Sequence, residues 1–275
     1  MLVVLAAQAV SRPAAQAVLD ADEVVVRLHA YLDAYEPRLR ELVADEAFEQ
    51  RITYVTDYGI RHVLERRRLV SDMGFLRLPG GLAWLAQRSV RSVDNRPVNG
   101  KAARLESVFE GAGEDVLAVA RKIADDNARF NLGHARSINV PTLPLDLLGR
   151  RHAPAFTASL EGRGRRGGRP VTILRFTEHP PGALVAHDGA QFSRADVRAW
   201  IADDGAVLRA DVSLQPPDGR GRHELRVDFA SNRPLDLIVP LRLTETYAGD
   251  VSGDGVATYR NYRRFRTSAR LVLPP

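Results

Sequence analysis

The second half of the chain alternates apolar and polar residues over a succession of short segments, and this pattern strongly constrains the fold. It is clearest in RADVRAWIADDGAVLRADVSLQ, residues 194–215, where Val197, Ala199 and Ile201 alternate with charged or aromatic side chains. The sequence Asp203-Asp204-Gly205 then favours a tight turn, and the alternation resumes after it. Because a period of two places successive side chains on opposite faces, this segment predicts a β-hairpin with one buried face.

Further segments from Ala153 onward show strand-like sequence and are separated by turn residues. They are FTASLEG (156–162), RPVTILRFTE (169–178), ALVAHDG (183–189), HELRVDFA (223–230) and LDLIVPLRLTETY (235–247). Pro240 lacks a backbone N–H, so its strand is expected at a sheet edge or at a bulge. Short turns between such strands predict an antiparallel meander with one buried face and one more polar face.

The first hundred residues predict one helix followed by strands. Residues 22–44 carry an apolar stripe at helical spacing, and Pro37 is expected to kink or restart this helix. Segments 48–56, 62–79 and 82–93 predict strands. A break or bulge is expected in the second of them near Ser71 to Gly74, and a tight turn at Asp94-Asn95.

The middle of the chain predicts helical structure. Residues 113–130 place an apolar face at helical spacing, and the proline-bounded, leucine-rich segment 139–149 predicts a short helix or loop. Such a segment is either a lid over a binding site or a plug that completes the core. The expected fold class is therefore α+β, a single domain over residues 18–275.

The stretch ATYRNYRRFR, residues 257–266, combines arginines with aromatic residues and raises the question of nucleic-acid binding. Strand alternation predicts that Tyr259, Asn261 and Arg263 share one face and that Tyr262 lies on the other. A platform for single-stranded nucleic acid needs its cations and aromatic rings together on one open face. The stretch therefore indicates a strand whose two faces are each partly covered.

The N-terminus resembles a secretory signal. An apolar run from Leu2 to Ala7 is followed by Pro13 and by the small-residue sequence Ala15-Gln16-Ala17, in the order expected for signal-peptide cleavage. A basic region before the run is missing, so the signal is expected to begin further upstream. Residues 1–17 are thus predicted to be a signal peptide, and the protein periplasmic or otherwise exported.

Charge and cysteine content exclude some classes of site. The net charge is +5, and all basic residues except Lys101 and Lys122 are arginine, spread along the chain among acidic residues. A selected nucleic-acid site would concentrate them, so nucleic acid is a disfavoured partner. The chain has no cysteine, which excludes disulfides, thiolate metal sites and cysteine nucleophiles.

The sequence contains no catalytic or cofactor motif that we recognise. No two histidines have the spacing of a zinc site, and neither a nucleophile elbow nor a phosphate-binding loop occurs. Glu46 and Glu49, three residues apart after the first predicted helix, are interpreted as belonging to a helix terminus. The prediction is therefore of no enzyme activity, no metal site and no cofactor, although residues brought together only in space would escape it.

The C-terminal third resembles the bacterial lipoprotein carrier group, the LolA/LolB-like exported proteins. The matching stretches are Trp200 to Arg209, Val227 to Arg233 and Val239 to Arg242. The resemblance covers residues 195–266, and the N-terminal half only by the order of elements. It implies a strongly curved antiparallel sheet, a half-barrel, with the N-terminal and middle helices packed on its concave side around an apolar cavity that takes acyl chains. The helical middle segments are larger than a carrier needs, and they could fill that cavity.

Three hypotheses for function follow. The first is a periplasmic carrier or sensor of a lipid, acyl chain or lipidated protein, with peripheral contact to an anionic membrane; a concave face packed without a cavity would argue against it. The second is an envelope scaffold or interaction protein with a filled core, and the third a nucleic-acid binder. For the first, the expected cavity-lining residues are aromatic: Tyr31, Tyr35, Trp84, Phe130, Trp200, Phe229, Tyr247 and Tyr259.

Overall fold

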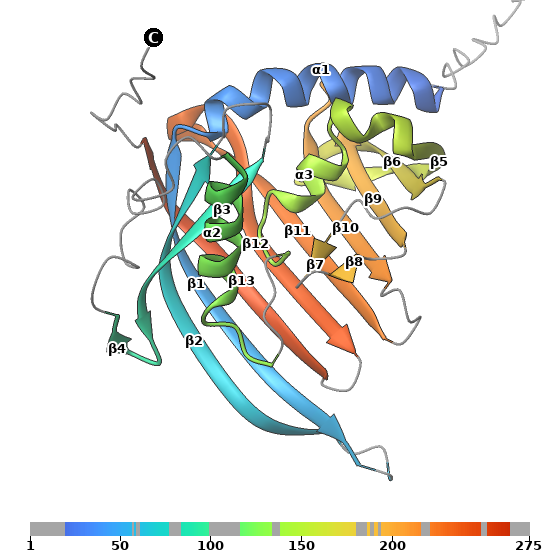
Figure 1. Cartoon of the computed structure of the whole chain (residues 1–275). Coiled ribbons are helices and arrows are strands. Elements are labelled where there is room, and N and C mark those ends of the chain that lie inside the picture. Colours follow the sequence, from blue (N-terminus) through green and yellow to red (C-terminus); the bar gives the residue numbers. More distant parts are fainter. Residues whose placement is uncertain are drawn as a thin grey trace, which may run out of the picture.

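Eleven antiparallel strands form one open sheet, in the order β4-β3-β2-β1-β13-β12-β11-β10-β9-β6-β5. The computed structural model describes residues 20–56, 58, 61–76, 84–98, 116–133, 138–179, 186–187, 190–191, 194–215, 221–248 and 252–264. The sheet is bent, and Figure 1 shows α1 across one end, with α2 and α3 on one of its sides. The predicted fold class, a curved antiparallel sheet with packed helices, is confirmed.

The bounds of the elements follow the predicted segments closely. The strands of the large sheet are β1 (Leu42–Val55), β2 (Arg61–Leu76), β3 (Leu85–Val93), β4 (Arg96–Pro97), β5 (Phe156–Arg166), β6 (Arg169–Glu178), β9 (Arg194–Ala202), β10 (Val207–Gln215), β11 (Arg222–Asn232), β12 (Leu237–Ala248) and β13 (Ser252–Arg264). A separate pair is formed by β7 (Ala186–His187) and β8 (Ala190–Gln191). The helices are α1 (Ala21–Leu39), α2 (Val116–Ala128), α3 (Leu143–Leu147), and the 3-10 turns η4 (Arg150–Ala155) and η5 (Arg233–Leu235).

The first helix is shorter than the sequence predicted. Its apolar stripe is buried as expected, but α1 ends at Leu39, and Leu42 and Val43 begin strand β1. Pro37 lies in the last turn and lacks the N–H that would continue the ladder, so it favours termination rather than a kink. Leu42 and Val43 matched the helical spacing by coincidence, because a buried strand residue is also apolar.

Helix α1 rests directly on the turn of the β9–β10 hairpin. A Cβ atom added at Gly205 would lie 2.4 Å from the carbonyl oxygen of Arg27, and Gly205 has φ +87°. The Tyr35 hydroxyl donates to the Ile238 carbonyl at 2.6 Å and so links α1 to β12 as well. The glycine of the predicted turn is therefore required twice, for the left-handed backbone and for the approach of the helix.

Two of the predicted irregularities are confirmed. The β2–β3 register shifts between Val70 and Ser71, at the start of the expected break, and the β11–β12 register shifts opposite Pro240. Asp94 and Asn95 have φ +48° and +64°, the left-handed pair of a tight hairpin turn.

The stretch at residues 257–266 forms part of β13, which the structure describes as far as Arg264. The faces to which its side chains point differ from the prediction. Asn261 has φ +51°, and the β1–β13 register shifts between Val43 and Asp45, so the alternation reverses at this point. Tyr259 is buried, and Tyr262 packs against the same core. Arg263 bonds Asp45 and Asp72 on the opposite face. The aromatic rings are thus inside and the arginines outside, which is the arrangement of a structural strand.

Some predictions lie outside the described residues. These are the signal peptide at residues 1–17, the turn at residues 79–81 and the first residues of the 113–130 helix. Within the described part of the chain, none of the helices is long and apolar enough to cross a membrane.

Candidate functional site

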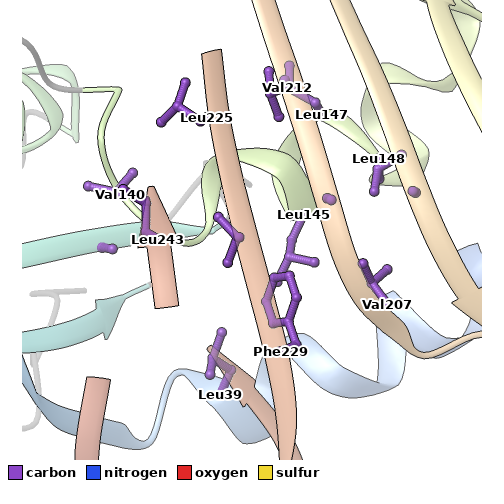
Figure 2. Close-up of a cluster of buried hydrophobic side chains, with 14 of the residues drawn as sticks. Leu39, Val140, Leu145, Leu147, Leu148, Val207, Val212, Leu225, Phe229 and Leu243 are labelled. Atoms are coloured by element: carbon purple, nitrogen blue, oxygen red, sulfur yellow. The ribbon is translucent and has the colours of Figure 1, made fainter. Parts of the chain in front are cut away.

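The hollow of the bent sheet is filled by the segment Ile138–Gly149, which we call the plug. Figure 2 shows plug side chains Val140, Leu145, Leu147 and Leu148 beside sheet residues from β10, β11 and β12. The sheet residues labelled there are Val207, Val212, Leu225, Phe229 and Leu243. All nine side chains are at most 9% exposed. The leucine-rich segment is therefore a plug, one of the two alternatives that the sequence left open.

Few polar bonds hold the plug in place. Among the described residues, its backbone hydrogen bonds stay local, such as Asp146 N–H to Thr142 O and Leu148 N–H to Pro144 O. Helix α3 has only five residues, too few to be stable by itself. The plug therefore depends on apolar burial against the sheet, on a hydrogen bond between His29 of α1 and the Leu148 backbone, and on a polar attachment at Asn139.

That attachment belongs to a fully buried ion pair between β1 and β3. Arg88 Nε donates to Glu46 Oε2 at 2.6 Å and Nη2 donates to Glu46 Oε1 at 3.0 Å. Both side chains are 0% exposed, and the guanidinium also lies 4.8 Å from the Phe48 ring centre. Burial lowers the pKa of Arg88, but the Glu46 carboxylate more than offsets this and the pKa is raised overall.

The remaining Arg88 protons attach both helical segments to the sheet. Nη2 donates to the Asn139 carbonyl at 3.0 Å, and Nη1 donates to the Asn127 carbonyl at 3.2 Å. The Asn127 side chain in turn accepts from the Arg88 N–H and donates to the Ala86 carbonyl. These two hydrogen bonds take the place of a neighbouring strand along part of β3. One buried arginine thus joins the sheet, α2 and the plug.

The sequence did not predict this cluster. Glu46 was assigned to a helix terminus with Glu49, whereas both lie on β1, where Glu46 is buried and Glu49 is exposed. The pairing of Glu46 with Arg88 arises because β2 lies between β1 and β3 in the sheet. No local signal in the sequence marks it, because oppositely charged residues occur throughout the chain.

Three of the predicted cavity-lining residues come together at the end of the sheet that α1 crosses. The rings of Tyr31 and Tyr35 stack at 5.4 Å, and those of Tyr35 and Trp84 at 5.9 Å. Tyr35 is buried, whereas Tyr31 and Trp84 are half-buried. Burial raises the pKa of Tyr31 to about 12, with a further rise from Asp204, and raises that of Tyr35 well above its usual value.

Four further predicted residues lie in or against the interior, but they do not line one common surface. Phe229 lies beneath the plug, and Tyr247 has its hydroxyl directed at the Leu132 carbonyl. Tyr259 is beside the Glu46–Arg88 pair; burial raises its pKa well above the usual value, and Glu46 raises it further. Phe130 is half-buried, next to Arg129.

Trp200 is separated from the other seven. It alternates with the buried residues Ala199 and Ile201 of β9 and points to the outer face. Arg198 and Arg209 lie 4.9 and 4.3 Å from its ring centre. Other arginines of this face pair with carboxylates, for example Arg175 and Arg198 with Glu161. The face is a mixed charged surface, as the dispersed arginines predicted.

The hollows lined by described residues include three of different size. One of about 410 Å³ lies over the outer face between Arg175 and Thr246, and a second of about 280 Å³ is lined by Arg66, Arg67 and Arg68. The third touches Trp84, Phe75 and Thr142 next to the plug and holds only about 10 Å³. No group of His, Asp or Glu among the described residues has the arrangement of a metal site.

The geometry defines a class of fold, an open curved sheet that holds an apolar interior on one side. No protein-family model matches the sequence, and a search of curated proteins finds no match. Among solved structures, the chain is similar to a LolA superfamily protein from Nitrosomonas europaea. The identity is 10%, the TM-score is 0.33, and the alignment covers 91% of this chain and 96% of that one.

Two other solved structures have similar values. A DUF1329 family protein from Desulfovibrio piger has 13% identity and a TM-score of 0.37, with 89% of this chain and 91% of that chain covered. A domain assigned as an outer membrane lipoprotein-sorting protein from Vibrio parahaemolyticus has 8% identity, a TM-score of 0.36, and coverage of 92% and 96%.

Proposed function

We propose that the chain is an exported, non-catalytic protein that binds an apolar chain, from a lipid or a lipidated protein, in the hollow of its curved sheet. In this proposal the ligand enters by replacing the plug, Ile138–Gly149. The hollow is filled in this structure, so the simple form of the carrier hypothesis, with an open cavity, is not retained. A ligand that takes the place of Leu145, Leu147 and Leu148 would restore the apolar contacts that the plug makes.

The observation that supports the proposal is the weak polar attachment of a strongly apolar segment. Three plug leucines are each at most 2% exposed, whereas the plug's backbone-to-backbone hydrogen bonds stay local among the described residues. Withdrawing the plug breaks few hydrogen bonds and exposes apolar surface on both sides. An acyl chain can bury the apolar surface that the sheet then exposes. This burial contributes about 25 cal/mol per Å² of apolar surface.

The second candidate is an envelope scaffold with a filled core. It is favoured by the void beside the plug, about 10 Å³, which is too small for a ligand. The two candidates differ in whether the plug moves. In the scaffold the plug is a permanent part of the core, and neither lipid challenge nor a weakened plug would load the hollow.

The deciding experiment is mass spectrometry of an organic extract from residues 18–275. The protein is exported with a functional signal peptide, purified without detergent, and analysed before and after incubation with phospholipid vesicles. Our proposal predicts a lipid at about one per chain after challenge, and more lipid in Leu145→Ala. A clean blank in every sample would contradict it and leave the filled-core scaffold.

Leu69→Ala is the matched control. Leu69 is as fully buried as Leu145 but belongs to β2 and not to the plug. Both changes remove the same atoms and cost about 2–5 kcal/mol of stability. If both raise the lipid content equally, general loosening of the core explains the uptake and the plug has no special role.

A further inference from the structure

Strand β2 extends beyond its neighbour on one side and leaves a free backbone edge. Its pairing with β3 begins at Leu69, whereas its pairing with β1 continues to the outer end of the strand. On the side away from β1, no described strand pairs with residues 62–68. Figure 1 shows β1 and β2 reaching past the rest of the sheet. Because Asp94 occupies the backbone groups of Arg68, the free edge covers residues 62–67, roughly 20 Å at about 3.3 Å per residue.

The backbone direction on this edge is fixed by Asp94. Its carboxylate accepts from the Arg68 N–H at 2.7 Å, and its own N–H donates to the Arg68 carbonyl at 2.8 Å. Both backbone groups of Arg68 therefore point away from β1. Because this direction alternates along a strand, the N–H and C=O of Arg66 also point to the free edge.

The edge is basic and partly apolar. Arg66, Arg67 and Arg68 line the hollow of about 280 Å³ together with Arg51, Glu49 and Asp94. Arg51 pairs with Asp254 and Arg67 pairs with Glu65, but neither Arg66 nor Arg68 has an ion pair within the described residues. Towards the outer end of β2, Val63 and Leu64 are 42% and 64% exposed.

We propose that residues 62–68 of β2 are a docking strand for an extended peptide that carries acidic residues next to apolar ones. The peptide would add a strand to the sheet, hydrogen-bonding to the backbone of Arg66. Its carboxylates would pair with Arg66 and Arg68, and its apolar side chains would cover Val63 and Leu64. This surface is separate from the hollow that the plug fills. Arg66 and Arg68, whose side chains have no ion pair among the described residues, thereby have a role.

The test uses a fluorescein-labelled peptide of alternating glutamate and valine, titrated with the full chain and followed by anisotropy. Arg66→Pro removes the edge N–H while leaving the β1–β2 hydrogen bonds, and proline is tolerated at such positions. We expect Arg66→Pro to weaken binding about tenfold, and Arg66→Ala, which keeps the N–H, about threefold. Arg260→Ala, which removes an exposed arginine of β13, should leave binding unchanged.

A cysteine reporter keeps the test valid if the proline variant unfolds. The chain has no cysteine, so Leu64→Cys carries a single nitroxide label at the edge. The peptide should immobilise this label and leave one at Arg260→Cys mobile. The proposal is overturned if folded Arg66→Pro binds like the parent chain, if a lysine–valine peptide binds equally, or if the Leu64→Cys label keeps its mobility. Binding to phosphatidylglycerol vesicles without peptide binding would assign the edge to a lipid surface and equally overturn it.

Discussion

Arg88 is the residue on which most of the interior polar contacts depend. Replacing it by methionine leaves the Glu46 carboxylate buried without its partner and leaves the Asn127 and Asn139 carbonyls without the guanidinium. We expect Arg88→Met to lower the free energy of unfolding by about 3–5 kcal/mol, measured by urea denaturation, because an unpaired buried charge is costly.

Two further variants control this prediction. Arg263→Met breaks exposed pairs with Asp45 and Asp72, and it should cost less than about 1 kcal/mol. Arg88→Met combined with Glu46→Leu removes both charges and should recover much of the loss. If Arg88→Met costs no more than Arg263→Met, the buried cluster does not hold the interior together.

The buried tyrosines predict instability at alkaline pH. Burial raises the pKa of Tyr35 and Tyr259 well above the usual value of about 10, and that of Tyr31 to about 12. The folded state favours their neutral form, so their contribution to stability is complete below pH of about 10 and is lost as the pH rises through the folded-state values.

An alkaline titration followed by tyrosinate absorbance and circular dichroism checks this expectation. Tyr31, Tyr35 and Tyr259 should ionise only as the secondary structure is lost. Ionisation of these three near the ordinary pKa, in a chain that stays folded, would show that their rings are not buried.

Among the elements, the β9–β10 turn and α1 depend on each other through Gly205. An alanine there would meet the Arg27 carbonyl and adopt an unfavourable positive φ. We expect Gly205→Ala to lower the free energy of unfolding by more than about 1 kcal/mol, measured by thermal denaturation. Gly164→Ala, at a position with no atom within 4 Å of the added Cβ, should change it by less than about 0.5 kcal/mol. Equal effects would mean that α1 does not rest on the turn.

Most strands could be predicted from the sequence, because their alternation records which face is buried. The β9–β10 hairpin and the bulge at Pro240 are examples. The prediction was wrong where one residue changes the periodicity. The left-handed Asn261 reverses the faces of β13, and α1 ends at Leu39 although apolar spacing continues to Val43. Neither event changes the apolar pattern on which the prediction depended.

At the scale of the whole molecule, the sequence predicted which segments and residues belong to the site better than it predicted where each of them lies. The curved sheet was expected and the plug was one of two alternatives, and Phe229 lies beneath the plug. Trp200 points to the outer face, as the alternation along β9 indicates, whereas the Glu46–Arg88 pair was missed because it depends on strand order rather than on local pattern. Whether the aromatic set contacts a ligand stays a prediction.

The central claim is that the plug leaves the hollow when an apolar chain binds. Leu145 and Phe229 belong to the same buried cluster and are both labelled in Figure 2, and the parent chain has no cysteine, so Leu145→Cys with Phe229→Cys is the disulfide designed to lock the plug. The measurement is the binding of a fluorescent fatty acid to this variant, oxidised and then reduced, with Leu145→Cys alone as the control. We predict that the double variant binds the fatty acid only after reduction. The control should bind it in both the oxidised and the reduced state. Equal binding by the locked form would place the ligand elsewhere and contradict the claim, and binding by neither form would make the filled core permanent.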